Sequence, residues 1–444
     1  MKILMVSNGY PVKETGGTEL YTQAISRHLA KQHQVRVFTR ENTPLLPDGK
    51  IFNYEDKGVA VVSLVNNNVF PPSFEGSYRN SLIDTLFIKC LEEFTPDVVH
   101  VQHCLGLSGD IFQILQERKI PYVCTLHDFW YLCPCIRLYH PDGSRCTGIC
   151  LRCFREFSGQ NRPLYPRIPG KIKRYVPEGL RKKLRGFRLG SFTSDSYLME
   201  AKEQLLKRKT FFHSALSQAQ MIICPSQYTQ DEYELNYSHK LCNSVILPHP
   251  MERKHLVGLP KPNFPPKIFG FMGVLGPYKG VHVLIEAFNK LESRAVKLEI
   301  WGDYQINLEY FSALKRKVKS TSNVDFMGAY KPEDLREILG HLDVVVIPSI
   351  CGETFNFTSR EALLAGRPLI ASDLGVLSEV VESGQNGYLF EAGNAVELKE
   401  IIHSLINGEL RPTGPFVGKA LALDEYGDQL QIIYQQALGG VDSA

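Results

Sequence analysis

Two glutamates separated by seven residues carry the strongest chemical signal in this chain. Glu353 lies in a loop after the apolar run Val344–Pro348, and Glu361 lies about one turn inside the predicted helix Phe357–Ala365. A carboxylate in the loop can accept hydrogen bonds from sugar hydroxyls, and one inside the helix can hold a ribose diol. Free N–H groups at the helix start would face a phosphate. A capping glutamate and a solvent-facing one would have the same spacing.

Five cysteines within 21 residues form the second signal, and the spacing Cys150-x2-Cys153 suits a tetrahedral thiolate site. We expect Cys133, Cys146, Cys150 and Cys153 to hold a structural zinc ion, with Cys135 as the alternative ligand. An iron–sulfur cluster is the second choice of metal. Free or disulfide-linked cysteines are the other interpretation. Four thiolates leave no open position on the ion, which favours a structural role over a catalytic one.

Composition limits the class of protein. A chain of 444 residues exceeds what one core usually holds, so two domains are expected. The 43% hydrophobic and 22% charged residues exclude a disordered chain or a fibre. The net charge of +3 does not indicate a nucleic-acid partner. Residues 162–188 are different, because ten Lys or Arg accompany one Glu there.

The basic stretch 162–188 could dock on anionic lipid headgroups, and a solvated basic helix is the alternative. No segment has the roughly 18 consecutive apolar residues that cross a bilayer. Residues 1–8 are interpreted as a buried strand rather than a signal peptide. We therefore expect a cytoplasmic protein, with peripheral contact at the inner face of the membrane through this stretch.

The elements that must position these residues form two α/β halves. Apolar runs alternate with amphipathic segments, as parallel strands do with their covering helices. The predicted strands are Lys2–Ser7, Val35–Thr39, Val59–Leu64, Asp97–Val101, Pro121–Leu126 and Met221–Pro225, then Ile268–Gly273, Lys297–Trp301, Val324–Met327, Val344–Pro348 and Leu369–Ser372. Each half is interpreted as Rossmann-like and doubly wound, so ligands should bind beyond the carboxyl ends of the strands.

Domain boundaries follow from composition. Residues 1–250 are expected to form the N-terminal domain, with an irregular cysteine-rich and basic insertion at about 133–214. Six prolines between Pro248 and Pro266 indicate a linker, placed at 251–266. Residues 267–420 form the C-terminal domain. The chain after Ser372 is expected to be helical, and 421–444 to return to the N-terminal domain.

Several motifs in order resemble a known family. Glu353-x7-Glu361 continues as Ala362-Leu363-Leu364-Ala365-Gly366-Arg367-Pro368. The other matches are Gly16-Gly17-Thr18-Glu19, Asp97-Val98-Val99-His100, Thr125-Leu126-His127-Asp128, Gly273-x5-Lys279-Gly280 and Gly384-Gln385-Asn386-Gly387. Together they resemble the retaining glycosyltransferases of family 4, which use nucleotide-sugar donors. The resemblance implies a GT-B fold, in which two Rossmann-like domains face each other across a cleft.

The resemblance also implies roles. Lys279 would contact the donor diphosphate, Glu353 the donor-sugar hydroxyls, Glu361 the ribose, and His127 the donor sugar near its anomeric centre. His127, Lys279 and Glu353 are thus the expected catalytic residues. The remaining donor-binding positions fall into three groups. Gly16 and Gly17 belong to a flexible loop, and Gly273 opens the loop that contains Lys279. Phe355, Asn356, Phe357 and Thr358 form a loop whose backbone amides would meet the diphosphate.

The implied activity is transfer of a hexose-type sugar from a nucleotide-diphosphate sugar to a glycan or lipid-linked saccharide, with retention. The family needs no catalytic divalent metal, and the chain has no Asp-x-Asp motif. Two positions depart from the pattern: Val274 stands where many members have arginine, and Phe355-Asn356 replaces Phe-Gly. Arg360 is a candidate for the missing cation.

Other functions remain open at this point. One is a different GT-B enzyme, such as a nucleotide-sugar epimerase or a phosphorylase, although the lack of a recognisable pyridoxal-lysine context argues against the phosphorylase. Another is a non-catalytic relative that binds nucleotide or glycan, which Val274 makes conceivable. A dinucleotide oxidoreductase is disfavoured, because no Gly-x-Gly-x-x-Gly follows the first strand.

Overall fold

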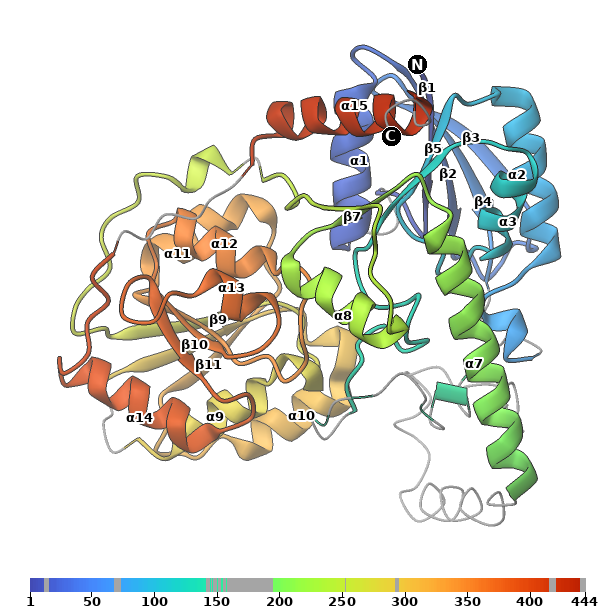
Figure 1. Ribbon diagram of the computed structural model, residues 1–444. Coiled ribbons are helices and arrows are strands. Elements are labelled where there is room, and N and C mark those ends of the chain that lie inside the picture. The colour runs from blue at the N-terminus through green and yellow to red at the C-terminus, as the bar shows by residue number, and fades with distance from the viewer. Residues whose placement is uncertain are drawn as a thin grey trace.

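The computed structural model describes residues 1–11, 16–67, 73–140, 144, 146, 150, 153–154, 157, 195–251, 253–291, 295–414 and 421–439. They form two α/β lobes, each built on its own sheet (Figure 1). The prediction of two parallel-sheet halves is therefore confirmed. The basic stretch 162–188 lies outside the described residues. None of the helices in the described ranges has the length and apolarity to cross a bilayer.

The N-terminal lobe holds a sheet of eight strands in the order β3-β4-β2-β1-β5-β6-β7-β8. Only the β3–β4 pair is antiparallel. The strands are β1 (Lys2–Ser7), β2 (Gln34–Glu41), β3 (Ile51–Asp56), β4 (Val59–Val65), β5 (Val98–Val101), β6 (Tyr122–Thr125), β7 (Met221–Cys224) and β8 (Ser244–Ile246). Strand β3 was not predicted. It lies at the sheet edge and is largely exposed, so it has no apolar run.

Helices cover both faces of this sheet. They are α1 (Gly17–Leu29), α2 (Ser81–Phe94), α3 (Asp110–Glu117), α7 (Asp195–Ser217) and α8 (Gln227–Tyr237), with the 3₁₀ turn η1 (Glu75–Ser77). The prediction of an irregular segment up to residue 214 is wrong for α7. Its buried residues, Ala201, Leu205, Arg208, Phe212, Ala215 and Leu216, follow a helical period. Arg208 interrupts the apolar pattern, yet it is buried against the Trp130 ring.

The C-terminal lobe holds six parallel strands in the order β11-β10-β9-β12-β13-β14. They are β9 (Ile268–Met272), β10 (Lys297–Trp301), β11 (Val324–Gly328), β12 (Val344–Ile347), β13 (Leu369–Ser372) and β14 (Gly387–Phe390). Strand β14 corrects the expectation that the chain after Ser372 is helical. The helices of the C-terminal lobe are α9 (Val281–Asn289), α10 (Leu308–Lys317), α11 (Leu335–His341), α12 (Phe357–Leu364), α13 (Val376–Val380) and α14 (Ala395–Ile406). Short 3₁₀ turns are η2 (Lys254–Leu256), η3 (Pro277–Lys279), η4 (Gln305–Asn307) and η5 (Pro332–Asp334).

The last helix, α15 (Leu423–Gly439), packs against α1 of the N-terminal lobe (Figure 1). The hydroxyls of Tyr426 and Tyr21 lie 2.6 Å apart, and the hydroxyl of Tyr434 lies 2.7 Å from Nδ1 of His100. The N–H of Met251 donates to the carbonyl of Leu421 at 3.0 Å. The chain thus crosses between the lobes twice, and the two crossings are hydrogen-bonded to each other.

The order of the strands in each sheet determines where the loops with the predicted site residues lie. In the second sheet, β9 lies between β10 and β12, so the chain leaves β9 and β12 in opposite directions. In open α/β sheets such a switch point is where ligands bind. The loop after β9 contains Lys279 and the loop after β12 contains Glu353. In the first sheet, the loop after β1 contains Gly16, and the loop after β6 contains His127.

Candidate active site

The loops after β9 and β12 touch through their backbones. Gly280 has φ +68° and forms the start of α9. A Cβ atom added there would lie 1.6 Å from the carbonyl oxygen of Pro348. Only glycine allows this approach, and the approach brings the end of η3 next to the loop that precedes α12.

Lys279 and Glu353 form an ion pair at this junction, with Nζ 2.7 Å from Oε2. Both side chains are largely buried, and the hydroxyl of Ser349 donates to the other carboxylate oxygen at 2.5 Å. Burial alone would raise the pKa of Glu353, but the charge and hydrogen bond of Lys279, together with the hydrogen bonds of Ser349 and Asn356, outweigh it and lower that pKa. Burial likewise opposes the charge on Lys279, yet Glu353 raises its pKa. Both groups are therefore ionised at neutral pH.

Glu361 is buried in α12 and accepts a hydrogen bond from Nε of Arg253 at 3.1 Å. Here burial is the larger influence, so the pKa of Glu361 is raised despite the nearby guanidinium. Arg253 belongs to the linker, and no motif in the sequence identified it. The two predicted glutamates thus lie in one region but have different partners.

The loop before α12 has the shape that its residues require. Asn356 has φ +55°, and its side-chain oxygen accepts from the N–H of Ser359 at 2.7 Å, capping α12. Asparagine adopts this left-handed conformation more readily than most residues, which explains how it can replace glycine here. The N–H groups of Phe357 and Thr358 lie in the first turn, where helices have no internal acceptors.

His127 lies where the lobes meet. Its ring is buried, with Nε2 2.8 Å from Oε1 of Gln102 and Nδ1 3.2 Å from Nε2 of His249. Burial, and after it the neighbouring histidines, keep its pKa well below the usual value, so the ring is neutral at neutral pH. The hydroxyl of Thr354, next to Glu353, donates to the backbone carbonyl of His127 at 2.6 Å. This bond joins the two halves of the predicted site.

An aromatic layer continues the contact between the lobes. The ring of His249 packs against Phe355 and Phe357, with centroids 4.9 and 6.1 Å away. Gly17 lies against the same layer, since an added Cβ would be 3.5 Å from the ring of Phe357. Gly16, just before α1, is exposed. His249 was not identified in the sequence, because it follows β8 without any motif.

Three further positions lie in or near the loop 273–280, which contains Lys279. Gly273 has φ +145° at the end of β9, and its carbonyl oxygen would lie 2.0 Å from a Cβ added to Gly302. Val274 is 40% exposed. Arg360 lies over the ring of Phe355 at 4.3 Å and donates to that residue's carbonyl at 3.4 Å. Burial lowers the pKa of Arg360 to about 10.

The five cysteines gather in the N-terminal lobe. The sulfur of Cys133 is hydrogen-bonded with those of Cys135, Cys146 and Cys153, and the Cys153 and Cys135 sulfurs are 3.4 Å apart. Ligand atoms of His140, Cys146 and Cys150 lie within 4.8 Å of one another. His140 is a candidate ligand that the cysteine count could not show. Thiolates with one imidazole form a donor set that suits Zn²⁺, and such spacings fit bonds of about 2.3 Å to a central ion.

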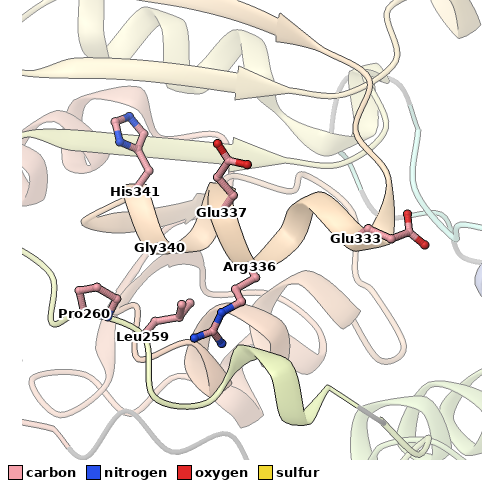
Figure 2. A pocket seen from close by; sticks show the side chains of 7 residues that line it. All are labelled: Leu259, Pro260, Glu333, Arg336, Glu337, Gly340 and His341. Atoms are coloured by element: carbon pink, nitrogen blue, oxygen red, sulfur yellow. The ribbon is translucent and has the colours of Figure 1, made fainter.

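A hollow of about 660 Å³ lies elsewhere on the C-terminal lobe, between the linker and α11 (Figure 2). Its lining includes Leu259, Glu337 and His341 but none of the predicted site residues. Arg336 points toward the linker and donates to the carbonyls of His255 and Val257. The hollow therefore lies between the linker and the C-terminal lobe, where the two pack against each other, and we assign it no ligand.

Two family models match the chain: Glycosyltransferase Family 4 over residues 15–167 and Glycosyl transferases group 1 over residues 266–408. An uncharacterized glycosyltransferase of Methanocaldococcus jannaschii is 27% identical over 209 residues, 47% of this chain and 56% of the relative. A lipopolysaccharide 1,2-N-acetylglucosaminetransferase of Salmonella typhimurium is 24% identical over 188 residues, 40% of this chain and 45% of the relative. The chain thus spans about half the length of these relatives.

The fold of the whole chain is similar to solved structures. HepE of Anabaena, in complex with UDP and glucose, superposes with a TM-score of 0.60 at 18% identity. The match covers 98% of this chain and 99% of that one. Both lobes therefore share the arrangement of a known two-domain fold.

Proposed function

Because this chain belongs to the family 4 glycosyltransferases and has their GT-B fold, we propose that it transfers a sugar from a nucleotide-diphosphate sugar to a glycan or lipid-linked saccharide. The product keeps the configuration of the anomeric carbon, and the step needs no divalent metal. Two names among the similar proteins support the donor and acceptor classes. HepE is described in complex with UDP and glucose, and the Salmonella relative is named for lipopolysaccharide.

The donor would lie across the switch point of the C-terminal lobe. Lys279 and the first amides of α12 supply positive charge for the diphosphate. Glu361 accepts from the ribose hydroxyls. Glu353, held ionised by Lys279, accepts from hydroxyls of the donor sugar. The ring of His127 is neutral, so it adds no charge next to a positive anomeric carbon. Both of its nitrogens are paired in this structure, with Gln102 and His249, so a hydrogen bond to the donor sugar would replace one of these partners.

The reaction exchanges one bond for another at the anomeric carbon. The bond to the diphosphate oxygen breaks, and a bond to the acceptor oxygen forms on the same face. The acceptor's proton passes to the departing phosphate oxygen, so no residue of the chain has to act as the base. Fixed cations and amides stabilise the charge that grows on that phosphate, which is the main demand of the step.

One observation carries this proposal: the buried ion pair of Lys279 and Glu353 at the switch point, beside a residue that contacts the opposite lobe. The test is incubation with labelled UDP-, GDP- and ADP-sugars, followed by release of nucleoside diphosphate. Slow hydrolysis of one donor by the protein, but not by Glu353→Gln, is expected. Binding without turnover by the unaltered protein would instead support a non-catalytic relative.

The proposal includes a structural metal at the cysteine cluster, held by Cys133, Cys146, Cys150 and Cys153, or with Cys135 or His140 among the ligands. Metal analysis of fresh protein should give about one zinc, or a coloured iron–sulfur cluster, per chain. Cys150→Ser should lose metal. Cys242→Ser should keep it, because Cys242 is exposed and lies in another loop. Absence of metal in protein prepared without chelator would refute this part.

A lipid-linked acceptor is supported by the composition of residues 162–188. The protein should sediment with vesicles that contain phosphatidylserine and stay in solution with neutral ones. Equal behaviour with both vesicles would argue for an acceptor that is not attached to a membrane.

A further inference from the structure

The proposed diphosphate site has less positive charge available than its chemistry needs. Lys279 is already paired with Glu353. Arg253 is paired with Glu361, and Arg360 lies on the ring of Phe355. A diphosphate carries at least two negative charges, and more charge collects on it as the bond to the sugar breaks. A further cation at this place would therefore have a clear use.

Arg137 of the N-terminal lobe lies beside the loop 273–280, which contains Tyr278 and Lys279. Its guanidinium carbon is 3.8 Å from the centroid of the Tyr278 ring, and Nζ of Lys279 is 5.8 Å from the same centroid. Burial raises the pKa of the Cys351 thiol, the charge of Glu353 raises it further, and the charges of Lys279 and Arg137 lower it. The arginine is thus part of the same electrostatic environment as the ion pair.

The chain holds Arg137 in a defined position. Its neighbours Ile136 and Leu138 both have positive φ, 76° and 55°, a conformation that residues other than glycine keep only where the surrounding structure holds them. Hydrogen bonds hold both: the N–H of Phe129 donates to Ile136 at 3.2 Å, and the N–H of Cys146 donates to Leu138 at 2.6 Å. Leu138 is buried while Arg137 is exposed. The turn therefore presents the arginine outward, from a segment bounded by the cysteine cluster.

We propose that Arg137 contacts the diphosphate of the nucleotide-sugar donor together with Lys279, so that the N-terminal lobe supplies a cation to a donor held mainly by the C-terminal lobe. This inference rests on the proposed function. In the present structure, the guanidinium stacks on Tyr278 rather than pairing with a carboxylate among the described residues. A planar guanidinium can leave a ring face and bind phosphate oxygens with two parallel hydrogen bonds.

The test compares nucleotides that differ only in the second phosphate. Binding of UDP, GDP and ADP, and of UMP, GMP and AMP, is measured by calorimetry for the unaltered protein, Arg137→Gln, Arg137→Lys and the control Arg118→Gln. Arg118 is a surface guanidinium of the same lobe, paired with Glu92. Arg137→Gln should weaken the preferred diphosphate about tenfold and change the monophosphate less than about twofold. Arg137→Lys should restore part of the loss, and the control should match the unaltered protein.

The outcomes separate this inference from the function on which it rests. If the unaltered protein binds a diphosphate and turns over its sugar, but Arg137→Gln binds that diphosphate equally well, the inference is wrong and the function stands. Equal weakening of mono- and diphosphate would also overturn the inference, because it indicates a disturbed fold rather than a lost phosphate contact. If the unaltered protein binds none of the six nucleotides, both proposals fail.

Discussion

The two glutamates of the C-terminal lobe show how differently one fold can treat the same side chain. Glu353 pairs with a lysine and a serine, and its pKa is lowered. Glu361 pairs with a single arginine, and burial raises its pKa. Both are largely buried, so the difference comes from the number and closeness of their donors rather than from exposure. An ionised carboxylate is the stronger acceptor for sugar hydroxyls, so Glu353 should keep this capacity to lower pH than Glu361 does.

Glu353→Gln should have the largest effect. Turnover should fall by about 100-fold or more, because the lost charge acts on the transition state. Affinity for nucleoside diphosphate should change by less than about threefold, since the sugar is absent from that ligand. Glu333→Gln is the control, because Glu333 is exposed on the same lobe. Unchanged turnover would remove Glu353 from the site.

Lys279→Gln should make Glu353 resemble Glu361. Without the lysine, only the hydrogen bonds of Ser349 and Asn356 oppose the effect of burial on Glu353, so its pKa should rise. The acid limb of the pH profile of kcat/KM should move to higher pH, and activity should be lost sooner as the pH falls. A lower rate with an unmoved acid limb would contradict the assignment. Lys290→Gln, in an exposed pair with Glu286, serves as the control.

Glu361→Gln should weaken nucleoside diphosphate binding about tenfold and change kcat by only a few-fold, because the ribose contact is made before and during the reaction. The sharper measurement uses the 2′-deoxy and 3′-deoxy nucleotides. The unaltered protein should prefer the ribonucleotide, and Glu361→Gln should lose that preference. A preference kept by the variant would place the ribose elsewhere.

The smallest effect concerns stability. The lowered pKa of Glu353 stabilises the fold above its unfolded value near 4.5, and this contribution is lost as the pH falls through the folded pKa. The raised pKa of Glu361 has the opposite sign, so its contribution is complete below 4.5 and is lost as the pH rises through the folded pKa. At pH 7, Glu353→Gln should therefore lower the free energy of unfolding, because it leaves the buried Lys279 without its charged partner, whereas Glu361→Gln should leave that free energy unchanged or raise it slightly.

Thermal unfolding at pH 7 and at pH 4 checks this difference. At pH 4, the loss of unfolding free energy in Glu353→Gln, relative to the unaltered protein, should be smaller than at pH 7. Any gain of unfolding free energy in Glu361→Gln should also be smaller at pH 4. Parallel changes of the two variants would mean that the two carboxyl groups do not differ in the way described.

Sequence alone could identify most of the second sheet, since strands such as β12 are buried on both faces and appear as continuous apolar runs. It could not identify β3, which is exposed, or α7, where a buried arginine interrupts the pattern. In the candidate site, motifs predicted Glu353 and Lys279, and the structure pairs the two side chains. Their surroundings depend on contacts between distant segments. Arg253 reaches Glu361 from the linker, and Arg137 reaches Tyr278 from the other lobe.

The double crossing at Met251 and Leu421 limits how the molecule can move. Two crossings joined by a hydrogen bond constrain the rotation of one lobe relative to the other more than a single crossing would. Arg137 belongs to the N-terminal lobe and Tyr278 to the C-terminal lobe, and their side chains are in contact. Any change in the spacing of the lobes at this place would therefore change the contact between these two side chains.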